Sequence, residues 1–416
     1  MRHHQRMSSV TAVCVGVFGL ALTFPVPASA VIDDDAAVVL LRSDCSPVSG
    51  LLDNCFETTA ALFDLTTGWV WDIRIPTAST PLLVDIGPGT FGPLNCKDAG
   101  FVTLRGSGRT ATKLLSTADN VPGANIENCV DIDFMDLTVA AENSNGVNPI
   151  GVNWVGTGSS NWTNVDILGH SVGTSSGVVW GWRENNLPCA APVSEHFFYS
   201  STIFGIHDAP NISTTYGFEA ACSINWIFGG EIVASTGGII AYGAVIHDRG
   251  DFRVFGSPIR AESTSTIGRS FGAYVTIDGV FHMHGGNIVA SGDTIATALF
   301  VANNAFVHTV GTAMRPTSSS TGTAKRIDVG SGSPRIESPL IWYAGTDAPT
   351  ADLSDPSSAF TTSITGADMF VETDCDNTGC SGSPNTPQPH LMIYSESCTD
   401  PTGGPWFDTA RGKCRE

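Results

Sequence analysis

Charged residues are scarce in this chain of 416 residues. They make up 14% of it, whereas an average soluble domain has about 25%. Cations are the scarcer kind, since 20 Lys and Arg stand against 40 Asp and Glu and give a formal net charge of −20. A chain without a basic surface is a poor candidate for binding nucleic acid. Hydrophobic residues still make up 42%, which is enough for a core and excludes disorder throughout. This composition favours an extracellular all-β protein.

Long apolar runs are absent after the N-terminal region. Arg2 and Arg6 precede an apolar stretch at 10–24, and Ala28-Ser29-Ala30 has the small residues that signal peptidase requires. We therefore predict that residues 1–30 are a signal peptide; a retained anchor helix is the alternative. No later segment has eighteen consecutive apolar residues, so we expect no membrane span after cleavage. The prediction is a secreted, periplasmic or cell-surface protein.

The paired C-x2-C signature of zinc sites is also absent. Of eleven cysteines, ten remain once Cys14 leaves with the signal peptide. An even number in an exported chain predicts disulfides, although sequence does not fix their connectivity. Spacing suggests these pairs: Cys45–Cys55, Cys96–Cys129, Cys189–Cys222, Cys375–Cys380 and Cys398–Cys414.

Helical periodicity is nearly absent. The exception is Asn54–Phe63, where Asn54 and Glu57 form a capping-box pattern that predicts an amphipathic helix. Elsewhere short apolar runs alternate with polar residues, as in Val130–Val139. Such alternation is typical of β-strands.

A repeat runs through the middle of the chain. Aligned segments place Gly229, Gly256, Gly285 and Gly311 at equivalent positions, 27, 29 and 26 residues apart. Helical repeats need periodic apolar faces that are missing here, and propeller repeats are longer, about 40 residues or more. Stacked β-strand coils remain, with glycine at the sharp turns. The side chains expected inside are Phe252, Val254, Ile259, Phe281, Met283 and Ile288.

The region from Cys55 to about Gly146 resembles the start of the pectin-lyase-like right-handed parallel β-helix superfamily. CFETTAALFD and PLLVDIGPGTF are similar to the capping helix and first strand of pectin methylesterases, and VTLRGSGRTATKL and ANIENCVDIDFMDLTVAAENSNG resemble the next two coils. The resemblance implies an all-β, single-stranded, right-handed parallel β-helix with an N-terminal capping helix. The catalytic motifs of pectin methylesterases and polygalacturonases are absent, so no active-site residue carries over.

The resulting domain prediction has four parts. Residues 1–30 are the signal peptide and 31–81 the N-terminal cap. Residues 82–344 form a β-helix of about ten coils, and 345–416 form an irregular, disulfide-stapled C-terminal cap. We expect the protein to be a monomer.

The residue three positions before each repeat glycine is the main candidate for a site. These residues are Trp226, Arg253, His282 and His308. They alternate with inward apolar residues and should point outward. Coils stack at about 4.8 Å, so the four would line one strip. Trp stacks on sugars, Arg pairs with carboxylates and His transfers protons. The alternative is an ordinary solvated face.

Three further groups are weaker candidates. Asp131 and Asp133 would bind calcium or act as an acid–base pair, unless they are only solubilising charge. Trp180 and Trp182 would form a sugar-binding platform if exposed, and would fill turns if buried. Asp374 and Asp376 lie in a D-x-D-N-x-G segment that suits calcium but lacks the closing glutamate.

The sequence is compatible with two functions. The first is action on, or binding of, polysaccharide. One form of it is a lyase of acidic glycans in which Arg253 or Arg260 neutralises the uronate and His282 takes the proton. The second is a non-catalytic surface, adhesive or glycan-binding β-helix. Calcium is a possible cofactor of the first.

Overall fold

The computed structural model describes most of the region between residues 37 and 343. The described residues are 37–45, 55–62, 76–144, 147–173, 177–185, 189, 194–210, 213–319, 322–331 and 334–343, with short pieces at 353–354, 370–372, 407–408 and 413–414. Ala37–Glu416 form one compact unit. The predicted signal peptide, Asp374 and Asp376 lie outside the described residues.

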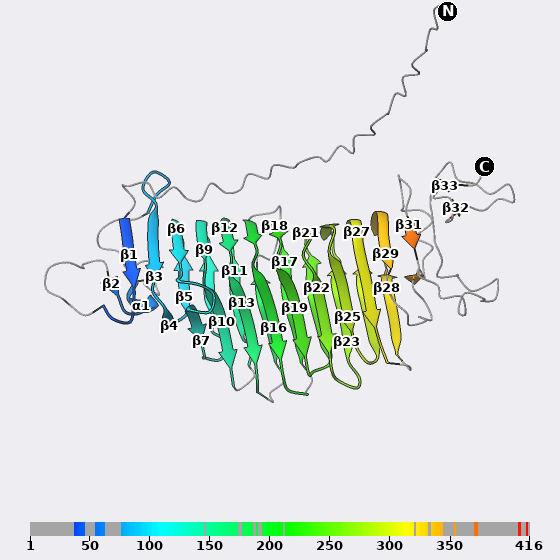
Figure 1. Ribbon diagram of the computed structural model, residues 1–416, viewed down its shortest axis with the longest axis horizontal. Coiled ribbons are helices and arrows are strands. Elements are labelled where there is room, and N and C mark those ends of the chain that lie inside the picture. Colours follow the sequence, from blue (N-terminus) through cyan, green and yellow to red (C-terminus); the bar gives the residue numbers. More distant parts are fainter. Residues whose placement is uncertain are drawn as a thin grey trace, which may run out of the picture. The chain divides into compact units, whose positions relative to one another are not determined.

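The described chain winds through repeated turns of three strands each, which stack side by side along one axis (Figure 1). We call the three sets of strands the first, second and third ladders. The first ladder consists of β3 (Leu82–Ile86), β6 (Gly100–Arg105), β9 (Val130–Met135), β12 (Gly158–Thr163), β15 (Ser194–Tyr199), β18 (Ser223–Phe228), β21 (Asp251–Phe255) and β24 (Val280–His284). The second consists of β4 (Gly89–Phe91), β7 (Thr112–Ser116), β10 (Thr138–Asn143), β13 (Asp166–Ser171), β16 (Thr202–His207), β19 (Glu231–Thr236), β22 (Ile259–Ser263) and β25 (Asn287–Ser291). The third consists of β5 (Leu94–Lys97), β8 (Ala124–Glu127), β11 (Ile150–Val155), β14 (Val178–Glu184), β17 (Thr214–Ala221), β20 (Ile240–His247), β23 (Arg269–Val275) and β26 (Ile295–Val301).

Every strand of these ladders pairs in parallel with its counterpart one turn away, so the protein is an all-β parallel solenoid. The first two ladders belong to one 21-stranded sheet and the third to a separate ten-stranded sheet. About eight complete turns are described, fewer than the ten expected. In the next two turns, the first and second strands merge into single long strands, β27 (Phe306–Thr317) and β29 (Arg335–Tyr343).

The repeat glycines lie at the sharp corner between the first and second ladders, as predicted. Their φ angles are 72° at Gly229, 71° at Gly256 and Gly285, and 63° at Gly311. This left-handed region penalises side chains with a Cβ. A Cβ added at Gly256 would meet nothing within 4 Å. Glycine is therefore favoured here by backbone conformation and not by lack of space.

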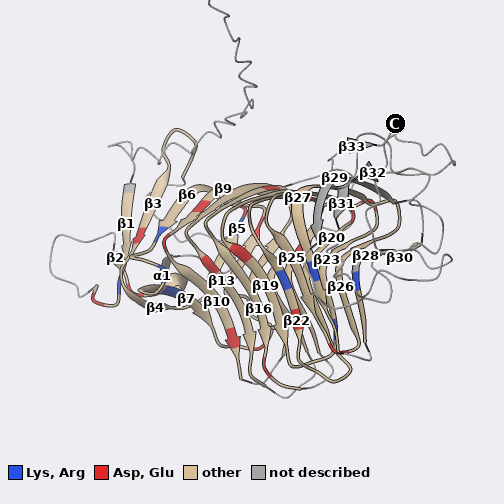
Figure 2. Ribbon diagram, turned by 45° about the vertical axis from the view of Figure 1, so that its right-hand side comes forward, with Lys and Arg blue, Asp and Glu red and all other residues tan. Residues whose placement is uncertain are grey.

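The interior is filled by alternate residues from all three ladders. Each of the six side chains predicted to face inward is buried, with at most 1% exposed. Large aromatic residues add to this core, among them Trp154, Trp162 and Trp182, which are fully buried. Burying a large apolar side chain stabilises a fold by about 1.5–3 kcal/mol. Charged residues are few along the strands (Figure 2).

The N-terminal end differs from the expected cap. β1 (Ala37–Leu41) already pairs in parallel with β2 (Cys55–Phe56) and β3, so the stack begins before Leu82. A longer helix was predicted over Asn54–Phe63. The described part of that segment has only β2 and one helical turn, α1 (Thr59–Leu62). The extended capping helix is therefore not shown.

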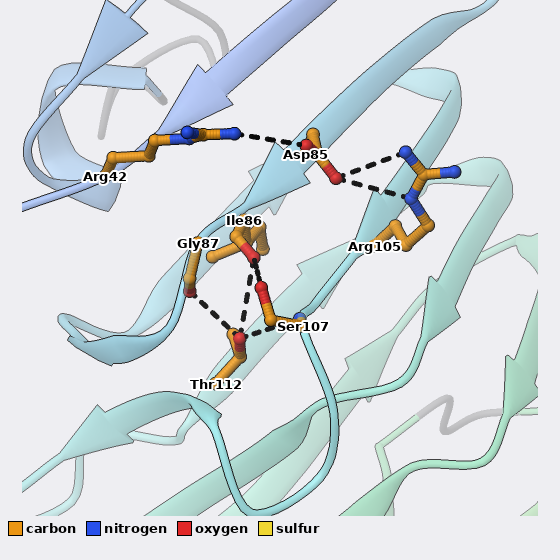
Figure 3. A network of polar contacts seen from close by, with 7 residues as sticks. All are labelled: Arg42, Asp85, Ile86, Gly87, Arg105, Ser107 and Thr112. Carbon is orange, nitrogen blue, oxygen red and sulfur yellow. Dashed lines mark hydrogen bonds and ion pairs between the residues drawn. The ribbon is translucent and has the colours of Figure 1, made fainter.

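Polar contacts tie the first turns together (Figure 3). Asp85 on β3 pairs with Arg42 at 3.6 Å and with Arg105 on β6 at 3.2 Å. The Thr112 hydroxyl donates to the Gly87 carbonyl oxygen at 2.9 Å, and the Ser107 hydroxyl donates to the Ile86 carbonyl oxygen at 3.1 Å. These contacts link neighbouring turns where the stack begins.

At the other end, parallel pairing continues past Ala344. β28 (Thr323–Val329) pairs with β30 (Leu353–Ser354), and β29 pairs with β31 (Phe370–Glu372). The last two short strands, β32 (Phe407–Asp408) and β33 (Lys413–Cys414), pair antiparallel. The described part of the predicted irregular cap thus includes short strands.

Two of the predicted disulfides are present, Cys96–Cys129 and Cys189–Cys222. Each joins positions one turn apart. The pairing of Cys45 with Cys55 stays a prediction, and the two C-terminal pairs involve residues outside the described part. No helix within the described residues is long and apolar enough to cross a membrane.

Candidate functional site

The four strip residues predicted from the repeat stack in direct register on the first ladder. Trp226 pairs with Arg253, Arg253 with His282, and His282 with His308. Each is half-buried and lies between fully buried neighbours along its strand. Because alternate residues of a strand face opposite sides, all four point away from the core.

The same row extends toward the N-terminus through turns in which the sequence repeat was not recognised. Phe197 pairs with Trp226, Asn161 with Phe197, and Asp133 with Asn161. We call the whole set the central row. Its members are Asp133, Asn161, Phe197, Trp226, Arg253, His282 and His308. Two groups that sequence analysis treated separately, the strip and the Asp131–Asp133 pair, thus belong to one surface.

Aromatic rings form a second column beside the central row. Tyr199 stacks on Phe228 with ring centroids 5.2 Å apart, Phe228 on Phe255 at 5.0 Å, and Phe255 on His284 at 5.2 Å. The planes of these neighbouring rings differ by 13° or less. Rings stacked along the solenoid axis cover one another's faces and present their edges outward.

Trp226 and Arg253 are both held by neighbours. The Trp226 ring is stacked with Phe197 at 6.0 Å, and the Arg253 guanidinium carbon lies 4.3 Å from its ring centroid. The indole Nε1 of Trp226 donates a hydrogen bond to Glu195 at 3.0 Å. The Arg253 guanidinium also donates to both carboxylate oxygens of Asp251, at 2.9 and 2.5 Å. A ligand therefore meets the edge of Trp226, and Arg253 already has a carboxylate partner.

The histidines at the far end of the row face one another. His308 lies 5.8 Å from His282 and 5.5 Å from His284, measured between ring centroids, with planes crossing at 73°. Burial lowers the pKa of His282, and burial together with the His308 charge lowers the pKa of His284. Both imidazoles are consequently neutral at neutral pH and can accept or donate hydrogen bonds.

The aspartates at the near end accept hydrogen bonds from the next turn. The exposed Asp131 accepts a hydrogen bond from the Ser159 hydroxyl at 2.7 Å, and Asp133 accepts one from the Asn161 amide at 2.7 Å. Burial raises the pKa of Asp133. Within the described part of the chain, no group of three or more His, Cys, Asp or Glu is arranged to hold a metal ion.

The remaining predicted site residues lie elsewhere. Arg260 is exposed on the second ladder, 3.7 Å from Glu231, and is not part of the central row. Trp180 is half-buried on the outer side of the third ladder. Trp182 is fully buried in the core, so the prediction that it contacts a surface ligand does not fit its position. The alternation of burial is interrupted here, since Gly181 and Trp182 are both buried.

A buried polar cluster inside the solenoid was not predicted. Glu184 accepts hydrogen bonds from the Trp182 indole at 3.0 Å and from the Ala221 backbone N–H at 2.8 Å, and also from the Ser223 hydroxyl. Burial raises the pKa of Glu184 to about 7. His196 lies 3.9 Å away, and burial lowers its pKa to about 3.

His196 links Glu184 to a serine, because its Nε2 faces Glu184 and its Nδ1 faces Ser160. Its Nδ1 is 2.8 Å from the Ser160 hydroxyl, which also accepts from the Trp162 indole at 2.7 Å. A serine, a histidine and a carboxylate thus lie close together, as in hydrolases. All three are at most 3% exposed, so no substrate reaches them. Their role is structural.

No protein-family model matches the chain, and no curated protein matches it at a significant level.

Proposed function

We propose that the protein binds an extended, neutral polysaccharide along the central row. One observation carries this proposal. One outward side chain per turn, aromatic at Phe197 and Trp226 and then Arg253, His282 and His308, recurs in register along the first ladder. Parallel strands are about 4.8 Å apart, which is close to the length of one sugar unit in an extended chain. A polymer of sugars is a ligand whose own repeat matches such a row.

The chemistry of the row supports a neutral glycan over an acidic one. Glu195 and Asp251 flank the aromatic residues and place two carboxylates on this surface, held by hydrogen bonds from Trp226 and Arg253. Arg253 is already paired with Asp251. A uronate chain would therefore meet carboxylates without a free cation to neutralise it. The aromatic edges add apolar contact area, and the neutral imidazoles of His282 and His284 add groups that can form hydrogen bonds with sugar hydroxyls.

The first prediction tests the row itself. We expect Trp226→Ala to weaken binding to the responsive polysaccharide by about tenfold, because it removes one aromatic ring and its contacts with Phe197 and Arg253. The measurement is depletion of the mature protein from solution by insoluble cellulose, xylan, mannan and starch granules. Val233→Ala is the matched control, since Val233 lies outward on the second ladder of the same turn.

The proposal fails if wild-type protein binds none of the four polysaccharides. It also fails if Trp226→Ala and Val233→Ala bind equally well. Circular dichroism of both variants separates loss of binding from loss of fold, because neither substitution removes a fully buried side chain.

A lyase of acidic glycans is the second candidate, and His282 favours it. Its lowered pKa leaves a free base on the outer surface at neutral pH. The pairing of Arg253 argues against a lyase. Arg253 would have to neutralise the uronate, but its guanidinium already donates to Asp251. Incubation with polygalacturonate, with and without calcium, should give no rise in the ultraviolet absorbance of an unsaturated product. A rise that His282→Ala abolishes would establish catalysis in place of binding.

We also propose that the protein is exported and acts outside the cell or in the periplasm. The two disulfides support this, because such bonds persist in oxidising compartments. We further propose that the solenoid is right-handed and of the pectin-lyase-like type. Parallel crossovers within one sheet are right-handed in about 98% of cases, which supports the handedness.

A further inference from the structure

A second aromatic row runs along the outer side of the third ladder. Trp180 pairs in register with Tyr216, Tyr216 with Tyr242, and Tyr242 with Phe271. We call these four the tyrosine row. Their ring centroids are 5.6, 5.1 and 5.2 Å apart, with planes within 16° of parallel. All four are half-buried. Like the central row, this row repeats once per turn.

The neighbouring side chains broaden this surface. The Arg183 guanidinium carbon lies 4.6 Å from the Trp180 ring centroid, and Arg183 is 3.9 Å from Glu219. Tyr274 packs edge-on against Tyr242 with centroids 5.4 Å apart. Burial raises the pKa of Tyr216, Tyr242 and Tyr274. These phenols therefore stay neutral and can donate hydrogen bonds to sugar oxygens.

The two rows lie on opposite sides of the core. Phe198, the inward neighbour of Phe197 on the first ladder, packs against Trp182 at 5.0 Å and Phe218 at 5.6 Å, both on the third ladder. The inner sides of the two ladders thus face each other, and their outer sides face apart. One glycan chain lying along either row cannot contact the other.

We propose that the tyrosine row binds a second chain of the same neutral polysaccharide, so that one molecule bridges two chains. This inference rests on the proposed function of the central row. Two features of the central row recur on the tyrosine row: one contact per turn and outward aromatic edges. The charged groups beside it, Arg183 and Glu219, lie 3.9 Å apart. A bridging protein would bind polysaccharide without needing to cleave it, which agrees with the buried position of the Ser160–His196–Glu184 cluster.

The experiment counts the chains bound. Wild-type mature protein is titrated calorimetrically with cellohexaose, xylohexaose, mannohexaose and maltohexaose, and the responsive hexaose should bind at two per protein molecule. Tyr216→Ala/Tyr242→Ala should bind one hexaose, on the central row. Trp226→Ala should bind one hexaose on the tyrosine row and hold the hexaose on the central row more weakly or not at all. Val233→Ala should still bind two. With the corresponding soluble long polysaccharide, only the wild type and Val233→Ala should increase light scattering through cross-linking.

The outcomes separate this inference from the proposed function. One hexaose per wild-type molecule, lost in Trp226→Ala and unchanged in Tyr216→Ala/Tyr242→Ala, overturns bridging and leaves the central row intact. One hexaose that is lost only in the tyrosine variant overturns both statements. If the double tyrosine variant does not fold, the wild-type stoichiometry and scattering still decide, since a value of one without cross-linking refutes bridging.

Discussion

At the scale of single residues, Glu184 is the least expected feature of the molecule. An ionisable group in a core is stable only if it is neutral or well paired. Glu184 accepts three hydrogen bonds, which favour its charged form, yet burial outweighs them and raises its pKa to about 7. His196 beside it is neutral because burial lowers its pKa to about 3. The pair is thus uncharged over much of the acidic range.

This arrangement makes stability depend on pH. The folded-state pKa of Glu184 is raised above its usual 4.5, so its contribution is complete below pH 4.5 and is lost as the pH rises toward 7. The folded-state pKa of His196 is lowered from 6.5, so its contribution is complete above pH 6.5 and is lost as the pH falls toward 3. The two effects oppose each other between pH 4.5 and 6.5.

Glu184→Gln isolates the first effect, because His196 is common to both proteins. We expect the variant to be less stable than the wild type at pH 5, since an amide N–H would then face one of the donors around Glu184. The difference should shrink by about 3 kcal/mol by pH 8, from about 1.4 kcal/mol per pKa unit. Urea unfolding at pH 5 and pH 8 measures it. Glu262→Gln, at an exposed residue, is the matched control. A constant gap for Glu184→Gln contradicts the prediction.

At the scale of the elements, the corner between the first and second ladders decides the geometry of each turn. The left-handed residue there is glycine in four turns, but it is Asp136, Asn164 or Ser200 in earlier ones, with φ of 53°, 56° and 50°. Asn and Asp tolerate this conformation better than other residues with a Cβ. The corner is therefore kept by more than one residue type.

Gly256 provides a clean test of this corner. Gly256→Ala should lower the free energy of unfolding by about 1 kcal/mol, because alanine pays the left-handed penalty while no atom lies near the new Cβ. Gly256→Asn should lose less. The readout is the urea midpoint of each variant. Equal losses for alanine and asparagine would show that crowding, and not backbone conformation, governs this position.

The same corner explains how much could be predicted from the sequence. Where glycine marks the corner, the spacing between glycines sets the register, so Trp226, Arg253 and His282 were correctly placed in one line. Phe197 stands at the same offset from Ser200, but serine gives no such signal, so the row was recognised only in part. Trp182 is buried although Trp180, two residues before it, faces outward, and this interruption at Gly181 is not revealed by alternation alone.

At the scale of the whole molecule, the solenoid is held together by contacts between neighbouring turns. In such stacks stability is close to a sum of terms from each turn and each interface between turns. Cys96–Cys129 links the turn of β5 to the next, and Cys189–Cys222 links the turn of β14 to the next. The two bridges thus fasten different interfaces, separated by a complete turn.

Each disulfide closes a loop with a sequence separation of 33, for which the loss of unfolded-state entropy predicts about 3–4 kcal/mol of stabilisation. Cys96→Ala/Cys129→Ala and Cys189→Ala/Cys222→Ala should therefore each lower the free energy of unfolding by that amount. Because the bridges share no turn interface, the quadruple variant should lose the sum of the two. Denaturant unfolding of the three variants measures these values. A quadruple loss well below the sum would mean that the turns unfold in separate groups, and that stability is not distributed over one continuous stack.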